Sequence, residues 1–180
     1  MNGVIIYKSV YGSTKQYAEW IQEETLFDII RFEDVKPEDL GRYTTIVIGT
    51  PVIASKPFLA RWIVENYDAL SHAEIVLFSC SASPPPSATL QRGFEGSLPE
   101  SMRERISYVQ LHGRYDYSKL TLLHKLMMRI GAWIQKDKRV KAEMKRDLHR
   151  VVDGVDRNTV AAVVDAVRKV TAGNMGGVRT

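Results

Sequence analysis

Apolar and polar positions divide most of this chain into short β-branched runs that alternate with stretches of helical periodicity. Near-continuous apolar runs are typical of strands buried on both faces of a sheet. They predict strands over residues 4–9, 27–32, 45–50, 74–79 and 106–112. Apolar residues three or four apart predict helices over residues 13–24, 57–68, 99–105 and 156–170. Pro57 fits the first turn of the second helix, and Gly173 marks the end of the last. Strands alternating with helices favour an α/β domain with a parallel sheet covered on both faces.

The composition suits a single globular domain, since 44% of the 180 residues are hydrophobic and 26% are charged. We expect this domain to span residues 1–172, with an insert at 114–150 and a flexible tail at 173–180. Cys80 is the only cysteine, which excludes an intrachain disulfide and favours a reducing, cytoplasmic location. We expect neither a signal peptide nor a membrane span, because no apolar run has the required length or flanks.

The net charge of +4 is concentrated in the predicted insert, where residues 114–150 hold eleven Lys or Arg and four Asp or Glu. Within the insert, residues 120–136 place most large apolar side chains on one face of a predicted helix. Two interpretations stay open. The face packs on the domain's own core or on a second copy in a homodimer, or it makes peripheral contact with an anionic membrane. Nucleic acid is not an expected partner, because the basic cluster at 136–150 lacks interleaved aromatic residues.

The loop after the first strand carries the residue types of an anion site. It reads Ser9-Val10-Tyr11-Gly12-Ser13-Thr14-Lys15, and a helix is predicted to begin within it. A helix N-terminus presents unpaired N–H groups and the positive end of the helix dipole, and hydroxyl groups add further donors. Gly12 lets the backbone approach a ligand closely. The alternative is a plain capped turn, because Ser and Thr are also the usual helix caps.

Three loops together resemble those of flavodoxins. Residues 9–14 match the phosphate loop T/S-x-T-G-x-T, with Tyr11 where that family usually has a hydroxyl residue. Residues 49–57 (Gly-Thr-Pro-Val-Ile-Ala-Ser-Lys-Pro) are similar to the loop that passes the isoalloxazine ring, and residues 78–85 (Phe-Ser-Cys-Ser-Ala-Ser-Pro-Pro) to the other flavin loop. The resemblance implies a five-stranded parallel sheet of order 2-1-3-4-5 that binds FMN at its C-terminal edge. The cofactor-binding residues that it implies are Ser9, Tyr11, Gly12, Ser13, Thr14, Lys15, Thr50, Pro51, Val52, Ile53, Ala54, Ser79, Cys80, Ser81 and Ala82.

Within flavodoxins, the segment after the fifth strand resembles the helical insert of the menaquinone-dependent protoporphyrinogen oxidase subgroup. That likeness rests on Gly113-Arg114-Tyr115-Asp116-Tyr117-Ser118 and on the helical pattern up to Gly131. It implies electron transfer or FMN-dependent oxidoreduction, with a redox protein or a quinone as partner. The parts of these loops expected beside the ring, residues 52–54 and 80–83, contain no aromatic residue that could stack on the flavin. The alternative function is therefore a binding or regulatory module of the same fold that has lost the flavin.

No catalytic acid or base and no metal site is assigned from the sequence. The four histidines show no ligand spacing with one another or with Cys80. Cys80 is interpreted as a small buried hydrophobe rather than a redox group, and His112 as structural rather than a proton donor.

Overall fold

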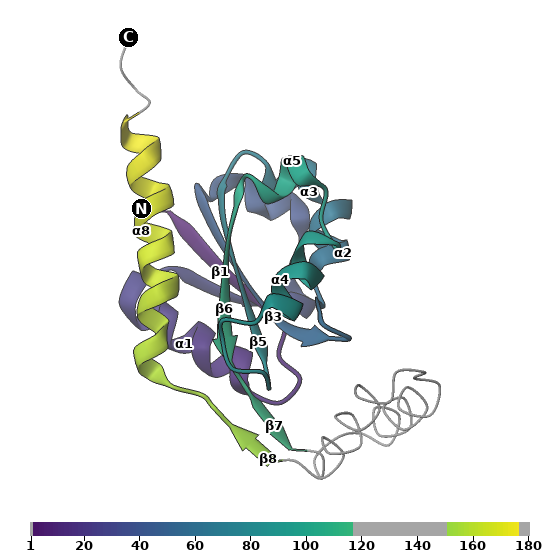
Figure 1. The fold of residues 1–180 in the computed structure, drawn as a ribbon. Helices are drawn as coiled ribbons and strands as arrows, with labels where there is room; N and C mark the ends of the chain where they lie inside the picture. Colours follow the sequence, from purple (N-terminus) through teal and green to yellow (C-terminus); the bar gives the residue numbers. More distant parts are fainter. Residues whose placement is uncertain (1, 117–150, 177–180) are drawn as a thin grey trace.

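A parallel sheet forms the centre of the computed structural model, which describes residues 2–116 and 151–176 (Figure 1). Its five parallel strands are β1 (Gly3–Tyr7), β2 (Asp28–Arg31), β3 (Thr45–Ile53), β5 (Glu74–Ser81) and β6 (Ile106–His112). Their order is β2-β1-β3-β5-β6. The flavodoxin-like arrangement 2-1-3-4-5 predicted from the sequence is therefore confirmed, with β5 and β6 as its fourth and fifth strands.

Helices cover both faces of the sheet (Figure 1). On one face lie α1 (Ser13–Thr25) and α8 (Val160–Gly176), the latter entered through the 3-10 turn η4 (Arg157–Thr159). On the other face lie the short helices α2 (Ala60–Glu65), α3 (Tyr67–Leu70), α4 (Ala88–Glu95) and α5 (Glu100–Arg103). The crossover from β2 to β3 contains the 3-10 turns η1 (Phe32–Asp34) and η2 (Pro37–Arg42).

Each central strand contributes side chains to two hydrophobic cores, because successive side chains point to opposite faces of a sheet. In β1, Val4 and Ile6 pack into the core beneath α2 and α4, while Ile5 packs into the core beneath α1 and α8. All three side chains are fully buried. This burial on both faces explains why the strands read as continuous apolar runs in the sequence.

Pro57 does not begin a helix, and the prediction that placed it in a first turn is wrong. It lies in the short strand β4 (Lys56–Pro57), which pairs antiparallel with the end of β3. The chain reverses through Ala54 and Ser55, whose φ angles are +50° and +64°. Proline suits such a short edge strand because it has no N–H to donate to a ladder.

The helix predicted over 57–68 is instead two helices, which begin at Ala60 and Tyr67. They are separated at Asn66, whose side chain donates to the carbonyl of Trp62 at 2.9 Å. An asparagine that bonds the backbone of the preceding turn competes with helix continuation. At the other end of the chain, α8 runs to Gly176, three residues beyond the predicted end at Gly173.

A two-stranded antiparallel ribbon extends from the C-terminal edge of the sheet (Figure 1). It consists of β7 (Arg114–Asp116) and β8 (Val151–Asp153), and it was not predicted. The helix expected at 120–136 and the basic cluster expected at 136–150 lie outside the described residues. In the part of the chain that is described, no helix has the length and hydrophobicity needed to cross a bilayer.

Candidate functional site

The loops after β1, β3 and β5 leave the sheet at the same edge. The strand register pairs Tyr7 with Gly49, Pro51 with Cys80, and Ser81 with His112. The chain leaves β1 toward β2 on one side, while β3 pairs with β1 on the other. Such a switch point is where open α/β sheets bind ligands, just outside the carboxyl ends of the strands.

The start of α1 has the backbone geometry of an anion site. Gly12 takes a left-handed conformation with φ of +88°, and no described side chain caps the helix at this position. The Ser9 hydroxyl oxygen accepts from the Gly12 N–H at 3.1 Å, which tightens the loop. The first intrahelical bond runs from the Gln16 N–H to the Gly12 carbonyl at 3.0 Å. The N–H groups of the first turn ahead of Gln16 therefore have no intrahelical acceptor.

The hydroxyls of this loop differ in their surroundings. Ser13 and Thr14 are both buried. The Ser13 oxygen accepts from the backbone N–H of Arg114 at 2.7 Å, and the Thr14 side chain is hydrogen-bonded to the Cys80 thiol. Burial raises the pKa of Tyr11, so its phenol stays neutral at physiological pH. Lys15 is exposed and pairs with Glu19 one turn along the helix, at 3.5 Å.

Three of the predicted ring-loop residues use their side chains to support the loops. Thr50 is fully buried; its hydroxyl accepts from the Leu59 N–H at 3.0 Å and donates to the Pro51 carbonyl at 3.1 Å. The Ser79 and Tyr108 hydroxyls are hydrogen-bonded at 2.8 Å, on the face of the sheet that α4 covers. Cys80 faces the opposite core, where burial raises its pKa to about 12.

The remaining ring-loop residues lie nearer to solvent. Pro51 and Val52 are half-buried, Ile53 and Ala54 are exposed, and Ser81 and Ala82 are half-buried. The Ser81 hydroxyl donates to the Ser83 carbonyl at 3.0 Å within its own turn. That these residues contact a flavin ring stays a prediction from the sequence.

Phe58 is an aromatic residue beside the first ring loop that sequence reasoning assigned to a helix core. Its side chain is 46% exposed, and its N–H donates to the Pro51 carbonyl at 2.9 Å. The β3–β4 reversal places it opposite Pro51 rather than inside a helix. The signal that could have found it is Pro57, since proline suits an edge strand as well as a first helical turn.

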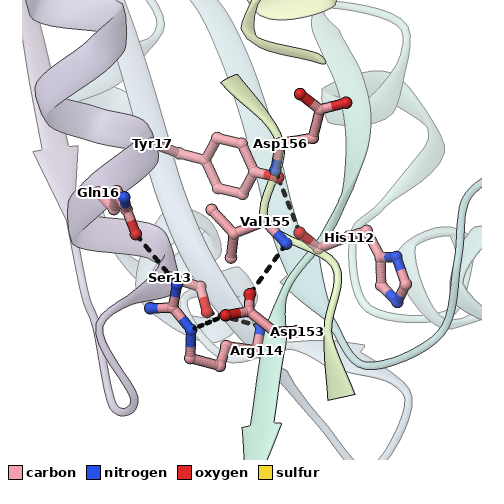
Figure 2. A network of polar contacts seen from close by, with 8 residues as sticks. All are labelled: Ser13, Gln16, Tyr17, His112, Arg114, Asp153, Val155 and Asp156. Carbon is pink, nitrogen blue, oxygen red and sulfur yellow. Dashed lines mark hydrogen bonds and ion pairs between the residues drawn. The ribbon is translucent and has the colours of Figure 1, made fainter. Parts of the chain in front are cut away.

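A polar network joins the start of α1 to the β7–β8 ribbon, as Figure 2 shows. The Arg114 guanidinium donates to the Asp153 carboxylate at 2.8 Å, and to the Gln16 side chain at 3.4 Å. The hydrogen bond from Arg114 lowers the pKa of Asp153 below its usual value. Neither Arg114 nor Asp153 was predicted to belong to the site, because contacts between residues so far apart in the sequence leave no local pattern.

The same network continues through Tyr17 toward the last helix (Figure 2). The Tyr17 hydroxyl donates to the His112 carbonyl at 2.8 Å and accepts from the Asp156 N–H at 3.0 Å. The His112 imidazole lies within hydrogen-bonding distance of the Ala82 carbonyl, 3.2 Å from Nε2. His112 therefore contacts the second ring loop through its side chain and α1 through its backbone.

These residues fit the phosphate of FMN better than they fit a metal. A Cβ added at Gly12 would meet no atom within 4 Å, so the loop borders open space in front of the uncapped helix end. Within residues 2–116 and 151–176, no group of three His, Cys, Asp or Glu side chains has the arrangement of a metal site.

Comparison with known proteins gives one family match. A family model described as a flavodoxin domain matches residues 4–141. Among solved structures, the chain is similar to a flavodoxin from the domain Archaea, with 18% identity, a TM-score of 0.48, and coverage of 95% of this chain and 99% of that chain. A flavoprotein from Lactobacillus acidophilus in complex with FMN has 17% identity and a TM-score of 0.44, over 62% of this chain and 91% of that chain. Two-electron reduced flavodoxin from Megasphaera elsdenii has 18% identity and a TM-score of 0.44, over 60% and 82%. The search of curated proteins gave no match.

Proposed function

Because the chain belongs to the flavodoxin family, we propose that it binds FMN at the carboxyl edge of its sheet and works in electron transfer or FMN-dependent oxidoreduction. The observation that carries this proposal is the uncapped N-terminus of α1 behind the left-handed Gly12. Backbone N–H groups and a helix dipole at such a position favour a phosphate group. FMN carries that phosphate, and riboflavin does not.

The chain's own residues would hold the cofactor and exclude water from it. The first turn of α1 and the hydroxyl of Ser13 would donate to the phosphate. Val52 and Ile53 on one loop, and Ala82 on the other, would offer mainly aliphatic surface to the ring. When bound, FMN supplies the redox chemistry through its isoalloxazine ring. No described side chain is assigned a proton-transfer role.

The partner is proposed to be a redox protein or a quinone that reaches the exposed loop edge. Val10 and Phe58 add exposed apolar surface to this edge, at 36% and 46% exposure. Such surface suits contact with an apolar or aromatic electron carrier. Peripheral membrane contact or homodimer formation through 114–150 stays a prediction from the sequence.

The proposal is tested by titrating the purified protein with FMN and with riboflavin, following the quenching of flavin fluorescence. We expect FMN to bind at least about tenfold more tightly, because hydrogen bonds to a charged group contribute about 1.5 kcal/mol or more each. Ser13→Ala should weaken FMN and leave riboflavin unchanged. Ser71→Ala is the matched control, since Ser71 lies beyond α3 at the opposite end of the sheet and bonds only the nearby Asp68 carbonyl through its hydroxyl.

Two results of these titrations would contradict the proposed FMN site. Equal affinity for FMN and riboflavin would remove the phosphate site while keeping a flavin site. Absence of binding to either ligand, in a protein that is folded by circular dichroism, would favour the binding module that has lost the flavin.

A further inference from the structure

The β7–β8 ribbon is hydrogen-bonded to the phosphate loop through the Ser13 hydroxyl. The backbone N–H of Arg114, the first residue of β7, donates to the Ser13 hydroxyl oxygen at 2.7 Å. Ser13 opens α1, so a strand far along the chain meets the first turn of the helix proposed to hold phosphate (Figure 2). The contact joins residues that are 101 positions apart.

We propose that Arg114 and Asp153 are positioning residues for the anion site, which orient the Ser13 hydroxyl as a donor to the bound phosphate. This proposal rests on the proposed function, because the phosphate it concerns is that of FMN. It adds the β7–β8 ribbon to the parts of the chain that determine phosphate affinity.

The Ser13 hydroxyl can accept from Arg114 and donate to a phosphate at the same time. A hydroxyl has one hydrogen to donate and two lone pairs that accept. The Arg114 N–H occupies one lone pair, so the hydroxyl hydrogen is directed away from that N–H. A phosphate in front of α1 offers it an anionic acceptor, and hydrogen bonds to ionised acceptors are about twice as strong as neutral ones.

The Arg114 amide is held in place by contacts on several sides. Its guanidinium donates to Asp153 on β8 at 2.8 Å and to Gln16 on α1 at 3.4 Å. The adjacent Gly113 N–H donates to the Ser81 carbonyl at 2.6 Å, and the Gly154 N–H donates to the Gly113 carbonyl at 3.2 Å. The amide is thus fixed between the sheet edge, the ribbon and the helix that it serves.

Arg114 could act on the phosphate by its charge or by its position, and the Asp153 carboxylate distinguishes the two mechanisms. Arg114 is a cation near an anion site, but the Asp153 carboxylate pairs with it. If the Arg114 charge itself attracted phosphate, removing Asp153 would leave that charge unpaired and tighten FMN binding. If Asp153 acts by holding Arg114 and its amide in place, removing it weakens FMN binding. The two mechanisms therefore predict opposite signs for one substitution.

The ion pair is also suitable for mutation without loss of the fold. The Arg114 and Asp153 side chains are 35% and 55% exposed. Exposed ion pairs make small contributions to stability. Arg61→Ala is the matched control, because it removes an exposed arginine that pairs with Glu65 at 2.7 Å on α2.

The test is a double-mutant cycle in FMN affinity, with riboflavin titrated in parallel. When Ser13 is present, we expect Arg114→Ala and Asp153→Ala each to weaken FMN binding about threefold. Ser13→Ala alone should weaken FMN binding about tenfold. In the Ser13→Ala background, neither ribbon substitution should weaken FMN further. Riboflavin affinity should stay unchanged throughout, and Arg61→Ala should match the wild type for both ligands.

The proposal is overturned if Asp153→Ala tightens FMN binding, or if Arg114→Ala weakens FMN equally with and without the Ser13 hydroxyl. Equal weakening of FMN and riboflavin would also overturn it, because that pattern indicates a general disturbance of the loops. These results leave FMN binding by the wild type intact. A wild type that binds no FMN instead removes the proposed function, and this inference with it.

Discussion

The Tyr17 hydroxyl is the point at which α1, the end of β6 and the start of the last helix are joined, so Tyr17→Phe should loosen all three. Tyr17 is fully buried. Its hydroxyl donates to the His112 carbonyl at 2.8 Å and accepts from the Asp156 N–H at 3.0 Å. Phenylalanine keeps the ring in the core beside Trp20, at a centroid distance of 5.6 Å. The substitution therefore removes the polar contacts and little else.

The size of the effect follows from what is left unpaired. Each buried group that loses its partner costs about 1–3 kcal/mol. The Thr159 hydroxyl, which lies 3.4 Å from the Tyr17 hydroxyl, keeps its 2.7 Å bond to the Asp156 carbonyl. Asp156 itself is exposed, so water can reach its freed N–H, whereas the half-buried His112 carbonyl is harder to satisfy. We expect a loss of about 2 kcal/mol in the free energy of unfolding.

The assay is urea unfolding followed by circular dichroism, supported by the melting temperature, which should fall by about 4–8 °C. Tyr67→Phe is the control, because the Tyr67 hydroxyl has no hydrogen-bond partner among the described residues and should change stability by less than about 0.5 kcal/mol. If Tyr17→Phe is as stable as the Tyr67→Phe control, the hydroxyl does not join these elements as argued.

Two further predictions concern stability. Cys80 has its pKa raised from 9.0 to about 12 by burial, so the unfolded chain loses the thiol proton above pH 9 while the folded chain keeps it. Through this group, the free energy of unfolding should fall by up to about 1.4 kcal/mol per pH unit between pH 9 and 12. Urea unfolding at a series of pH values should show a shallower decline for Cys80→Ala than for the wild type. Equal declines for the two proteins would contradict the raised pKa of Cys80. Gly93→Ala should cost about 3 kcal/mol in urea unfolding, because a Cβ there would lie 1.7 Å from the Ser55 carbonyl oxygen. Gly41→Ala, whose Cβ would meet no atom within 4 Å, is its control, and similar stabilities for the two variants would refute the close packing of α4 on the β3–β4 turn.

The strands were predictable because burial on both faces of the sheet requires continuous apolar runs in the sequence. Helix α4 was not predicted, because its buried residues are only Leu90 and Phe94, a single pair four positions apart after three successive prolines. Its start depends on Ser87, whose hydroxyl accepts from the Leu90 N–H at 3.4 Å. One capping serine among several serines carries too little information to place a helix.

The loops of the candidate site were predictable as segments but not residue by residue. β5 continues to Ser81, so Ser79 and Cys80 alternate between the two cores instead of lining the edge. The strand period explains this arrangement once the end of the strand is known, and a sequence does not locate that end to within one or two residues. The contact between Ser13 and Arg114 has no local signal, because it depends on how the completed sheet brings distant segments together.

The ribbon has a consequence for how this fold accommodates change in chain length. Asp116 and Val151 are register partners in an antiparallel pair, so the chain departs and returns at points about 5 Å apart. A two-residue hairpin turn spans such a gap as readily as a long excursion does. Lengthening the excursion costs only the slow, logarithmic growth of loop-closure entropy. Insertions and deletions between these two residues therefore leave the strand register of the main sheet untouched, and the domain can gain or lose material there without refolding its core.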